Sequence, residues 1–202
     1  MSKIGLFYAS ITGTTRKIAR QIQTKYLEPD CVDLFDLDDA SCVDMAEYET
    51  LIIGTSTWGD GEYPYSLEAF LPQLDSIRFE GKRIALFGLG DQLGYPQEFV
   101  DALGLLYLEL KKRGATIIGD WPTNGYDYQA SKADLGDGRF CGLVLDEDNQ
   151  SELTPHRLAE WIGGIRDALL PREEGIRQGT GQHSATACKP GLNQTDETHK
   201  KK

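Results

Sequence analysis

The chain has 202 residues, 40% of them hydrophobic, and 32 acidic against 21 basic residues give it a net charge of −11. This length suffices for one large core but not for two ordinary domains. The acidic balance argues against nucleic acid and anionic membranes as partners. No apolar run reaches the ~18 residues of a membrane helix, and polar residues follow the first apolar run too closely for a signal peptide.

The cysteines are scattered along the chain and form neither a C-x-x-C pair nor a Cys/His group with zinc-like spacing. They are Cys31, Cys42, Cys141 and Cys188. This pattern favours reduced thiols in a cytoplasmic protein and predicts no metal site.

The charge and composition change near Pro171. From there on the chain has six basic and four acidic residues, so this end is near +2 and residues 1–170 carry about −13. The stretch 175–202 is rich in Gly, Gln, Thr, Ser and Lys, and it has too few apolar side chains to offset the entropy of ordering. We therefore expect a folded domain at 1–170 and a disordered polar extension at 171–202.

Short apolar runs alternate with helical patterns along the domain. Strands are expected at 4–9, 31–35, 51–55, 83–88 and 116–119, and a further run at 140–145 continues or pairs with the fifth. Helices are expected at 16–26, 66–74, 97–113 and 155–169, the last with Thr154 as N-cap before Pro155. This alternation predicts an α/β fold with a parallel sheet between two layers of helices, and ligands bind such sheets at the carboxyl ends of the strands.

The loop after the first strand leads directly into the first helix and has the sequence Ser10-Ile11-Thr12-Gly13-Thr14-Thr15. Backbone N–H groups and the positive end of the helix dipole face such a loop, and its hydroxyls can donate further hydrogen bonds. No lysine stands in the P-loop pattern. The loop therefore predicts a terminal monophosphate that is bound and not transferred.

Two further loops at the same expected edge carry aromatic side chains and glycines. The loop 55–62 contains Trp58 between Thr57 and Gly59, and the loop 88–95 ends in Tyr95. Aromatic rings can stack on a planar ligand, and glycines let the backbone approach it closely. Together the three loops fit a flat ring system with a phosphate tail, the shape of flavin mononucleotide (FMN).

On these motifs, and on 121–127 and 142–150, the chain resembles the long-chain flavodoxins over residues 1 to about 170. The resemblance implies a doubly wound five-stranded parallel sheet in the order 2-1-3-4-5. It also implies that an insertion at about 121–139 splits the fifth strand, and that one FMN is bound non-covalently.

The resemblance also implies roles for individual residues. The hydroxyls of Ser10, Thr12 and Thr15 would bind the phosphate, Trp58 and Tyr95 would sandwich the ring, and the amides near Leu89, Gly90 and Asp91 would bind its edge. Asp148 would lie near the ribityl chain, and the Gly59–Asp60 peptide would flip so that the Gly59 carbonyl accepts a hydrogen bond from the protonated flavin N5. The full expected cofactor set is Ser10, Ile11, Thr12, Gly13, Thr14, Thr15, Thr55, Ser56, Thr57, Trp58, Gly59, Asp60, Gly61, Leu89, Gly90, Asp91, Tyr95 and Asp148. Arg16 and Lys17, which follow the phosphate loop directly, bring positive charge near the phosphate.

The function that the resemblance implies is a low-potential one-electron carrier, with no catalytic residues, that shuttles between semiquinone and hydroquinone. Its partners would be a flavodoxin reductase as donor and redox enzymes as acceptors, with basic faces that dock to this acidic monomer.

Two alternatives remain at this point. An FMN-dependent quinone reductase would need an open ring face, for which two flanking aromatic residues leave little room. A signalling receiver domain would need an acidic pair after the first strand, where this chain has Ala9 and Ser10.

Overall fold

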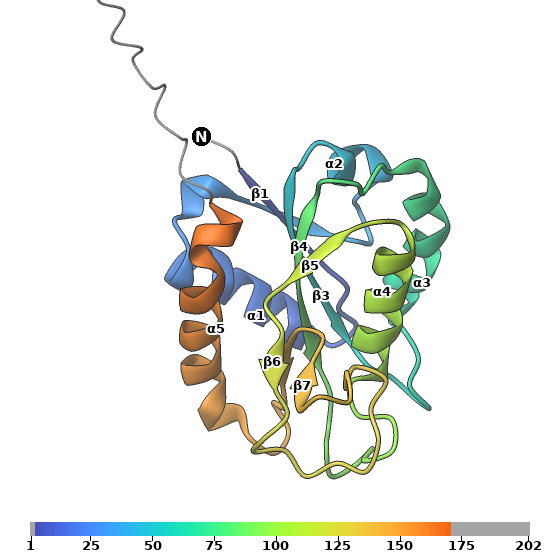
Figure 1. The fold of residues 1–202 in the computed structure, drawn as a ribbon, viewed down its shortest axis with the longest axis vertical. Helices are drawn as coiled ribbons and strands as arrows, with labels where there is room; N and C mark the ends of the chain where they lie inside the picture. Colours follow the sequence, from blue (N-terminus) through green and yellow to red (C-terminus); the bar gives the residue numbers. More distant parts are fainter. Residues whose placement is uncertain (1–2, 171–202) are drawn as a thin grey trace, which may run out of the picture. The chain divides into compact units, whose positions relative to one another are not determined.

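The computed structural model describes residues 3–170, so the extension expected at 171–202 lies outside the described residues. Its main sheet is parallel, in the order β2-β1-β3-β4-β5 (Figure 1). The strands are β1 (Ile4–Tyr8), β2 (Val32–Asp36), β3 (Thr50–Ser56), β4 (Arg83–Leu89) and β5 (Thr116–Ile118). The predicted fold class and strand order are confirmed.

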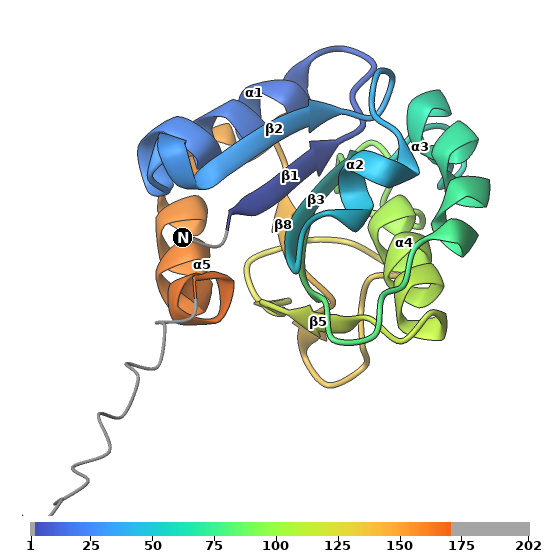
Figure 2. The ribbon, with the colours of Figure 1, turned by 90° about the horizontal axis from the view of Figure 1, so that it is seen from above.

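Helices cover both faces of this sheet. Helices α1 (Thr14–Gln21) and α5 (Thr154–Leu169) lie on one face, and α3 (Tyr65–Phe70) and α4 (Asp101–Lys112) lie on the other (Figures 1 and 2). A π-helical turn (Ile22–Tyr26) continues α1, and a 3₁₀ turn (Leu71–Ser76) continues α3. The remaining helical segments are α2 (Cys42–Ala46) and the 3₁₀ turns Pro29–Cys31 and Ser151–Leu153. No helix within residues 3–170 is both long and apolar enough to cross a membrane.

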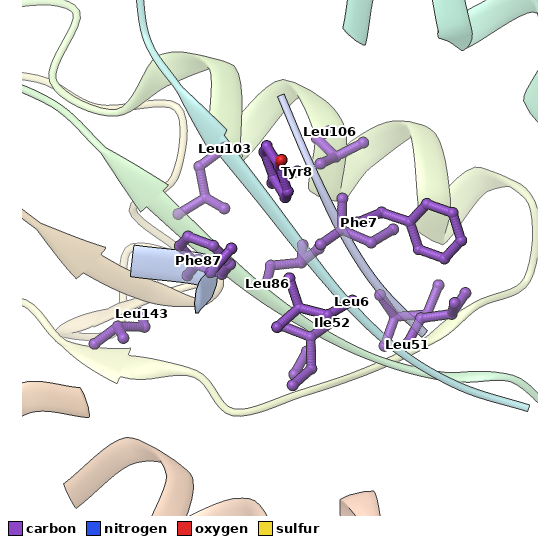
Figure 3. Close-up of a cluster of buried hydrophobic side chains, with 14 of the residues drawn as sticks. Leu6, Phe7, Tyr8, Leu51, Ile52, Leu86, Phe87, Leu103, Leu106 and Leu143 are labelled. Atoms are coloured by element: carbon purple, nitrogen blue, oxygen red, sulfur yellow. The ribbon is translucent and has the colours of Figure 1, made fainter. Parts of the chain in front are cut away.

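The core explains why the central strands are continuous apolar runs. All five residues of β1 are buried, as are the first six of β3 and the last six of β4. Figure 3 shows side chains of these strands, among them Leu6, Ile52 and Leu86, with Leu103 and Leu106 of α4. Because helices cover both faces, a polar side chain on either face of a central strand would be buried, which costs free energy.

The fifth strand is in two pieces along one edge of β4. Strand β5 pairs with Arg83–Ala85, and β8 (Leu143–Leu145) pairs in parallel with Phe87–Leu89. The intervening segment contains an antiparallel pair, β6 (Trp121–Pro122) with β7 (Arg139–Phe140). The expected split of the fifth strand by an insertion is therefore confirmed, and the run 140–145 belongs to two different strands.

Three details of the helices differ from the sequence-based expectation. Helix α4 starts at Asp101 instead of residue 97, because Val100 has a left-handed backbone conformation (φ 51°) that ends the preceding turn. Thr154 is not the N-cap of α5 but its first residue, and its hydroxyl donates to Glu147 instead. Helix α2 was not expected, although Ser41 and Asp44 form a capping box at its start.

Candidate functional site

A cleft of about 490 Å³ lies where the loops after β1, β3, β4 and β8 meet. The size is typical of sites for small organic ligands. Its lining consists of Thr12, Thr14, Lys17, Ser56, Thr57, Trp58, Gly59, Leu89, Gly90, Asp91, Tyr95, Glu147 and Asp148. The cleft thus lies at the carboxyl edge of the sheet, as the strand–helix alternation predicts.

One end of the cleft is the turn between β1 and α1. Gly13 stands at the N-cap with φ 92°, and its N–H donates to Ser10 Oγ over 3.1 Å. The hydroxyls of Thr12 and Thr14 are 3.3 Å apart. No side chain caps α1 and no acidic residue lies in its first turn, so the N–H groups there are left for another acceptor. This end of the cleft therefore suits an anion.

The turn after β3 carries Trp58 at its base. The N–H groups and carbonyls of Trp58 and Glu62 bond to each other in both directions, at 3.0 and 2.6 Å. The indole Nε1 donates to Ser56 Oγ over 2.9 Å, which fixes the ring's polar edge. The three residues at the tip, Gly59 to Gly61, include two glycines with positive φ, 47° and 90°.

The loop after β4 carries Tyr95, which is 51% exposed. The carboxylate of Asp91 accepts hydrogen bonds from the N–H groups of Leu93 and Gly94, at 3.1 and 2.7 Å. These bonds, Gly94's above all, lower the pKa of Asp91. The loop backbone closes when Tyr95 N–H donates to the Asp91 carbonyl over 3.0 Å.

A buried carboxylate, Asp146, joins this loop to the one after β8. It is 0% exposed and accepts from the backbone N–H and the side-chain amide of Gln92, at 3.1 and 2.7 Å. It also accepts from the N–H groups of Asp148 and Asn149, at 3.1 and 2.9 Å. Asn149 in turn donates to Asp91 over 2.7 Å. One buried carboxyl group thus joins the loops after β4 and β8.

Backbone hydrogen bonds also join the loops after β3, β4 and β8. Thr57 N–H donates to the Leu89 carbonyl over 3.0 Å, and Gly90 N–H donates to the Leu145 carbonyl over 3.1 Å. The loops after β3, β4 and β8 are therefore joined to one another. An anion-binding turn at one end, with an indole and a phenol in these loops, is suited to a flat aromatic molecule with an anionic tail.

Comparison with known proteins agrees with this geometry. The family model for flavodoxin matches residues 6–161 of the chain. The chain belongs to the flavodoxin family.

Relatives in this family match over nearly their whole length. The flavodoxin of Synechocystis sp. is 46% identical over 169 residues, which are 84% of this chain and 99% of the relative. Flavodoxin 1 of Escherichia coli is 44% identical over 84% of this chain and 96% of its own. A crystal structure of Fusobacterium nucleatum flavodoxin bound to flavin mononucleotide has a TM-score of 0.79 at 34% identity, over 84% of this chain and 99% of that one. Since flavodoxins are electron-transfer proteins, so is this one, and the expectation that it is not an enzyme is confirmed.

The cleft of this flavodoxin brings together eleven of the residues that the sequence singled out. They are Thr12, Thr14, Ser56, Thr57, Trp58, Gly59, Leu89, Gly90, Asp91, Tyr95 and Asp148. The other seven do not line it: Ser10, Ile11, Gly13, Thr15, Thr55, Asp60 and Gly61. Thr15 is only 1% exposed and Thr55 is fully buried, whereas the Ser10 hydroxyl bonds within the loop.

Two lining residues of this flavodoxin were not among the expected ones, Lys17 and Glu147. Glu147 could have been found because it follows the run 140–145, whose end lies at the same sheet edge. Lys17 was noted only as a nearby charge, because the sequence does not show which way a helical side chain points. Among residues 3–170, no group of three or more His, Cys, Asp and Glu is arranged to hold a metal ion.

Acidic side chains dominate the part of the cleft that the loops after β4 and β8 form. Asp91, Glu147 and Asp148 line it, and Asp146 is buried behind them. Desolvation, followed by repulsion from Asp91, Asp146 and Glu147, raises the pKa of Asp148. The cleft therefore has one end suited to an anion and one wall that repels negative charge.

Proposed function

We propose that this cleft binds FMN non-covalently and that the protein carries single electrons between redox partners. The observation that carries the proposal is the convergence of an anion-binding turn, Trp58 and Tyr95 on one cleft. The bound flavin supplies the redox chemistry, because it can accept one electron or two. The protein's part is to bind the flavin, orient it and set which reduced form is stable.

The proposed contacts follow from the lining. The phosphate is bound by the first-turn N–H groups of α1 and by the hydroxyls of Thr12 and Thr14. Trp58 and Tyr95 lie on the two faces of the ring, and backbone groups of Leu89, Gly90 and Asp91 bind its edge. Asp148 lies by the ribityl chain.

The acidic wall favours a low potential for the second electron. Adding it creates an anionic ring, which nearby carboxylates repel and aromatic faces solvate poorly. Asp91 and Asp148 line the cleft beside Tyr95, and Asp146 adds a buried charge behind them. We therefore assign the working cycle to the one-electron-reduced and two-electron-reduced forms.

The tip of the Trp58 turn is suited to a backbone change that accompanies reduction. Only the base of the turn is bonded, and Gly59 has a φ of 47°. Glycine crosses between backbone regions without the penalty of a Cβ atom. We assign the carbonyl of Gly59 as the group that would accept a hydrogen bond from the flavin ring when the ring is protonated.

The partners we propose are a reductase and low-potential acceptor enzymes with basic faces. Support comes from the acidic residues around the cleft and from the charge of about −13 on residues 1–170. Electron transfer rates should fall steeply between low and physiological ionic strength. A flat response would rule out electrostatic steering.

We further propose that the protein acts as a cytoplasmic monomer whose folded domain is 1–170. Three cysteines of the described residues are free thiols, Cys31, Cys42 and Cys141. A truncation after residue 170 should keep flavin binding, and sedimentation should give the mass of one chain.

An anaerobic redox titration of the purified protein, followed by absorbance, tests the carrier function. We expect a yellow protein that accepts two electrons in separate one-electron steps, with the second at low potential. A colourless protein that ignores added FMN would refute the cofactor. A single two-electron step would refute the one-electron carrier.

A further inference from the structure

Lys17 is the one basic residue among those that line the cleft within residues 3–170. It lies in α1, one turn after the phosphate loop, and its backbone N–H donates to the Gly13 carbonyl over 2.9 Å. Its side chain is 64% exposed, so its ammonium group is free to change position. The hydroxyls of Thr12 and Thr14 line the same cleft.

The neighbouring cations of α1 point elsewhere. Arg16 is tied toward β2, where its guanidinium lies 3.0 Å from Asp36 and over the ring of Tyr8. Arg20 lines a neighbouring groove along α1, which Gly13, Arg16 and Lys17 also line, and it does not line the cleft. Of the three basic residues in this helix, only Lys17 lines the cleft.

A carboxylate that is distant in the sequence, that of Glu147, holds Lys17 loosely. The ammonium nitrogen lies 3.5 Å from Glu147 Oε2, which is longer than a good charge-assisted hydrogen bond. Glu147 itself is fixed, because the Thr154 hydroxyl donates to its other oxygen and its side chain is only 14% exposed. The lysine is therefore the movable member of the pair.

We propose that Lys17 leaves Glu147 and pairs with the phosphate of FMN, so that this side chain helps the protein distinguish FMN from flavins without a phosphate. The proposal rests on the proposed function and names a specificity-determining residue of that site. A phosphate monoester carries a charge of about −1.5 to −2 at neutral pH, so it competes well with a single carboxylate for one ammonium group. In the flavin-free protein, Glu147 keeps Lys17 at the edge of the cleft.

The test compares FMN with riboflavin, which lacks the phosphate. The full-length chain is stripped of flavin, and the affinity for each flavin is measured by quenching of flavin fluorescence. In Lys17→Gln we expect FMN affinity to fall about fivefold or more and riboflavin affinity to stay unchanged. The salt dependence of FMN binding should also become shallower, since one ionic contact is lost.

Arg20→Gln is the matched control, because it removes the same charge from the same helix outside the cleft. The change in FMN affinity that it causes should be less than half of the change caused by Lys17→Gln. If the two variants lower FMN affinity equally, the effect comes from the overall positive charge of the helix. That result would overturn the proposed contact between Lys17 and the phosphate. An equal loss for FMN and riboflavin in Lys17→Gln would overturn the phosphate as its target.

Glu147→Gln tests the competition. It should tighten FMN binding by a larger factor in the natural chain than in the Lys17→Gln background, because only the former has a lysine to release. The same factor in both backgrounds would overturn the exchange between Glu147 and phosphate. If the natural chain binds no FMN, the proposed function fails; if it binds FMN and Lys17→Gln binds equally well, only this inference fails.

Discussion

The two loops that carry the aromatic rings of the cleft differ in how they are held. The loop with Tyr95 is tied by Asp91 and, through Gln92, by the buried Asp146. The turn with Trp58 is hydrogen-bonded at its base, through Thr57, Trp58 and Glu62, whereas Gly59, Asp60 and Gly61 at its tip make no hydrogen bond within the described residues. One wall of the cleft is thus fixed, and the tip of the other can rearrange.

This difference suits an electron carrier. A fixed wall keeps the flavin in one position and limits the reorganisation that accompanies each electron. A free tip lets a single peptide respond to protonation of the ring without disturbing the rest of the site. The following predictions test whether the fixed wall and the free tip are as different as their hydrogen bonds indicate.

The largest effect is expected on the fixed wall, at Asp146. Asp146→Ala leaves the N–H groups of Gln92, Asp148 and Asn149 without their acceptor in a buried place. The free energy of unfolding of the flavin-free protein should fall by about 2–4 kcal/mol, measured by urea denaturation. Asp148→Ala, at the exposed neighbour, is the control, and a similar small loss in both would contradict the role of Asp146.

The two glycines in the tip of the Trp58 turn should differ next. At Gly61, with φ 90°, an added Cβ would lie 2.8 Å from Asp101 Oδ2, and Lys132 holds that carboxylate in place. Gly61→Ala should cost about 1–2 kcal/mol of unfolding free energy. Gly59→Ala, where the nearest atom is the end of exposed Glu62 at 3.1 Å, should cost less than half as much. A larger loss at Gly59 would show that the tip is not free.

A similar or somewhat smaller effect is expected from the ring on the fixed wall. Tyr95→Ala removes one stacking face and should weaken FMN binding by about tenfold, equivalent to about 1.4 kcal/mol. Leu93→Ala is the control, because Leu93 is 61% exposed in the same loop but does not line the cleft. Equal losses would mean that the loop, and not the ring, is the source of the affinity.

The smallest effects come from two carboxylates whose pKa values move in opposite directions. Hydrogen bonds from Gly94 and Leu93 lower the pKa of Asp91, so its contribution to stability is present above pH 3.8 and is lost as the pH falls through its lowered pKa. Burial and neighbouring acids raise the pKa of Asp148, so the native chain loses stability as the pH rises from 3.8 through that raised pKa. Below pH 3.8, raising the pH should therefore lower the unfolding free energy of Asp91→Asn relative to that of the natural chain. Above pH 3.8, raising the pH should increase the unfolding free energy of Asp148→Asn relative to that of the natural chain.

Both variants are measured by urea denaturation across pH 3 to 6, and each change should stay below about 1 kcal/mol because both side chains contact solvent. Parallel slopes for the two variants would contradict the opposite shifts.

Some local features were not recovered from the sequence because they depend on the rest of the fold. Helix α2 has five residues, too few for a periodic pattern, and only the Ser41–Asp44 capping box marks it. The start of α4 depends on a left-handed backbone at Val100, which a β-branched residue rarely adopts. The Thr154 hydroxyl bonds to Glu147 and does not cap its own helix. Only the packing of α5 beside β8 brings these two residues together.

The sequence alone determined the layered fold and the place and chemistry of the binding cleft. It could do so because strands buried on both faces are continuous apolar runs, and because parallel strands bring the loops at their carboxyl ends to one edge. Only the tertiary structure decided which side chains of those loops face the cleft: Thr14 does, Thr15 does not, and Lys17 meets Glu147 there. The orientation of these side chains depends on how α1 is rotated against the sheet and on contacts between residues far apart in the chain. A local sequence pattern predicts neither.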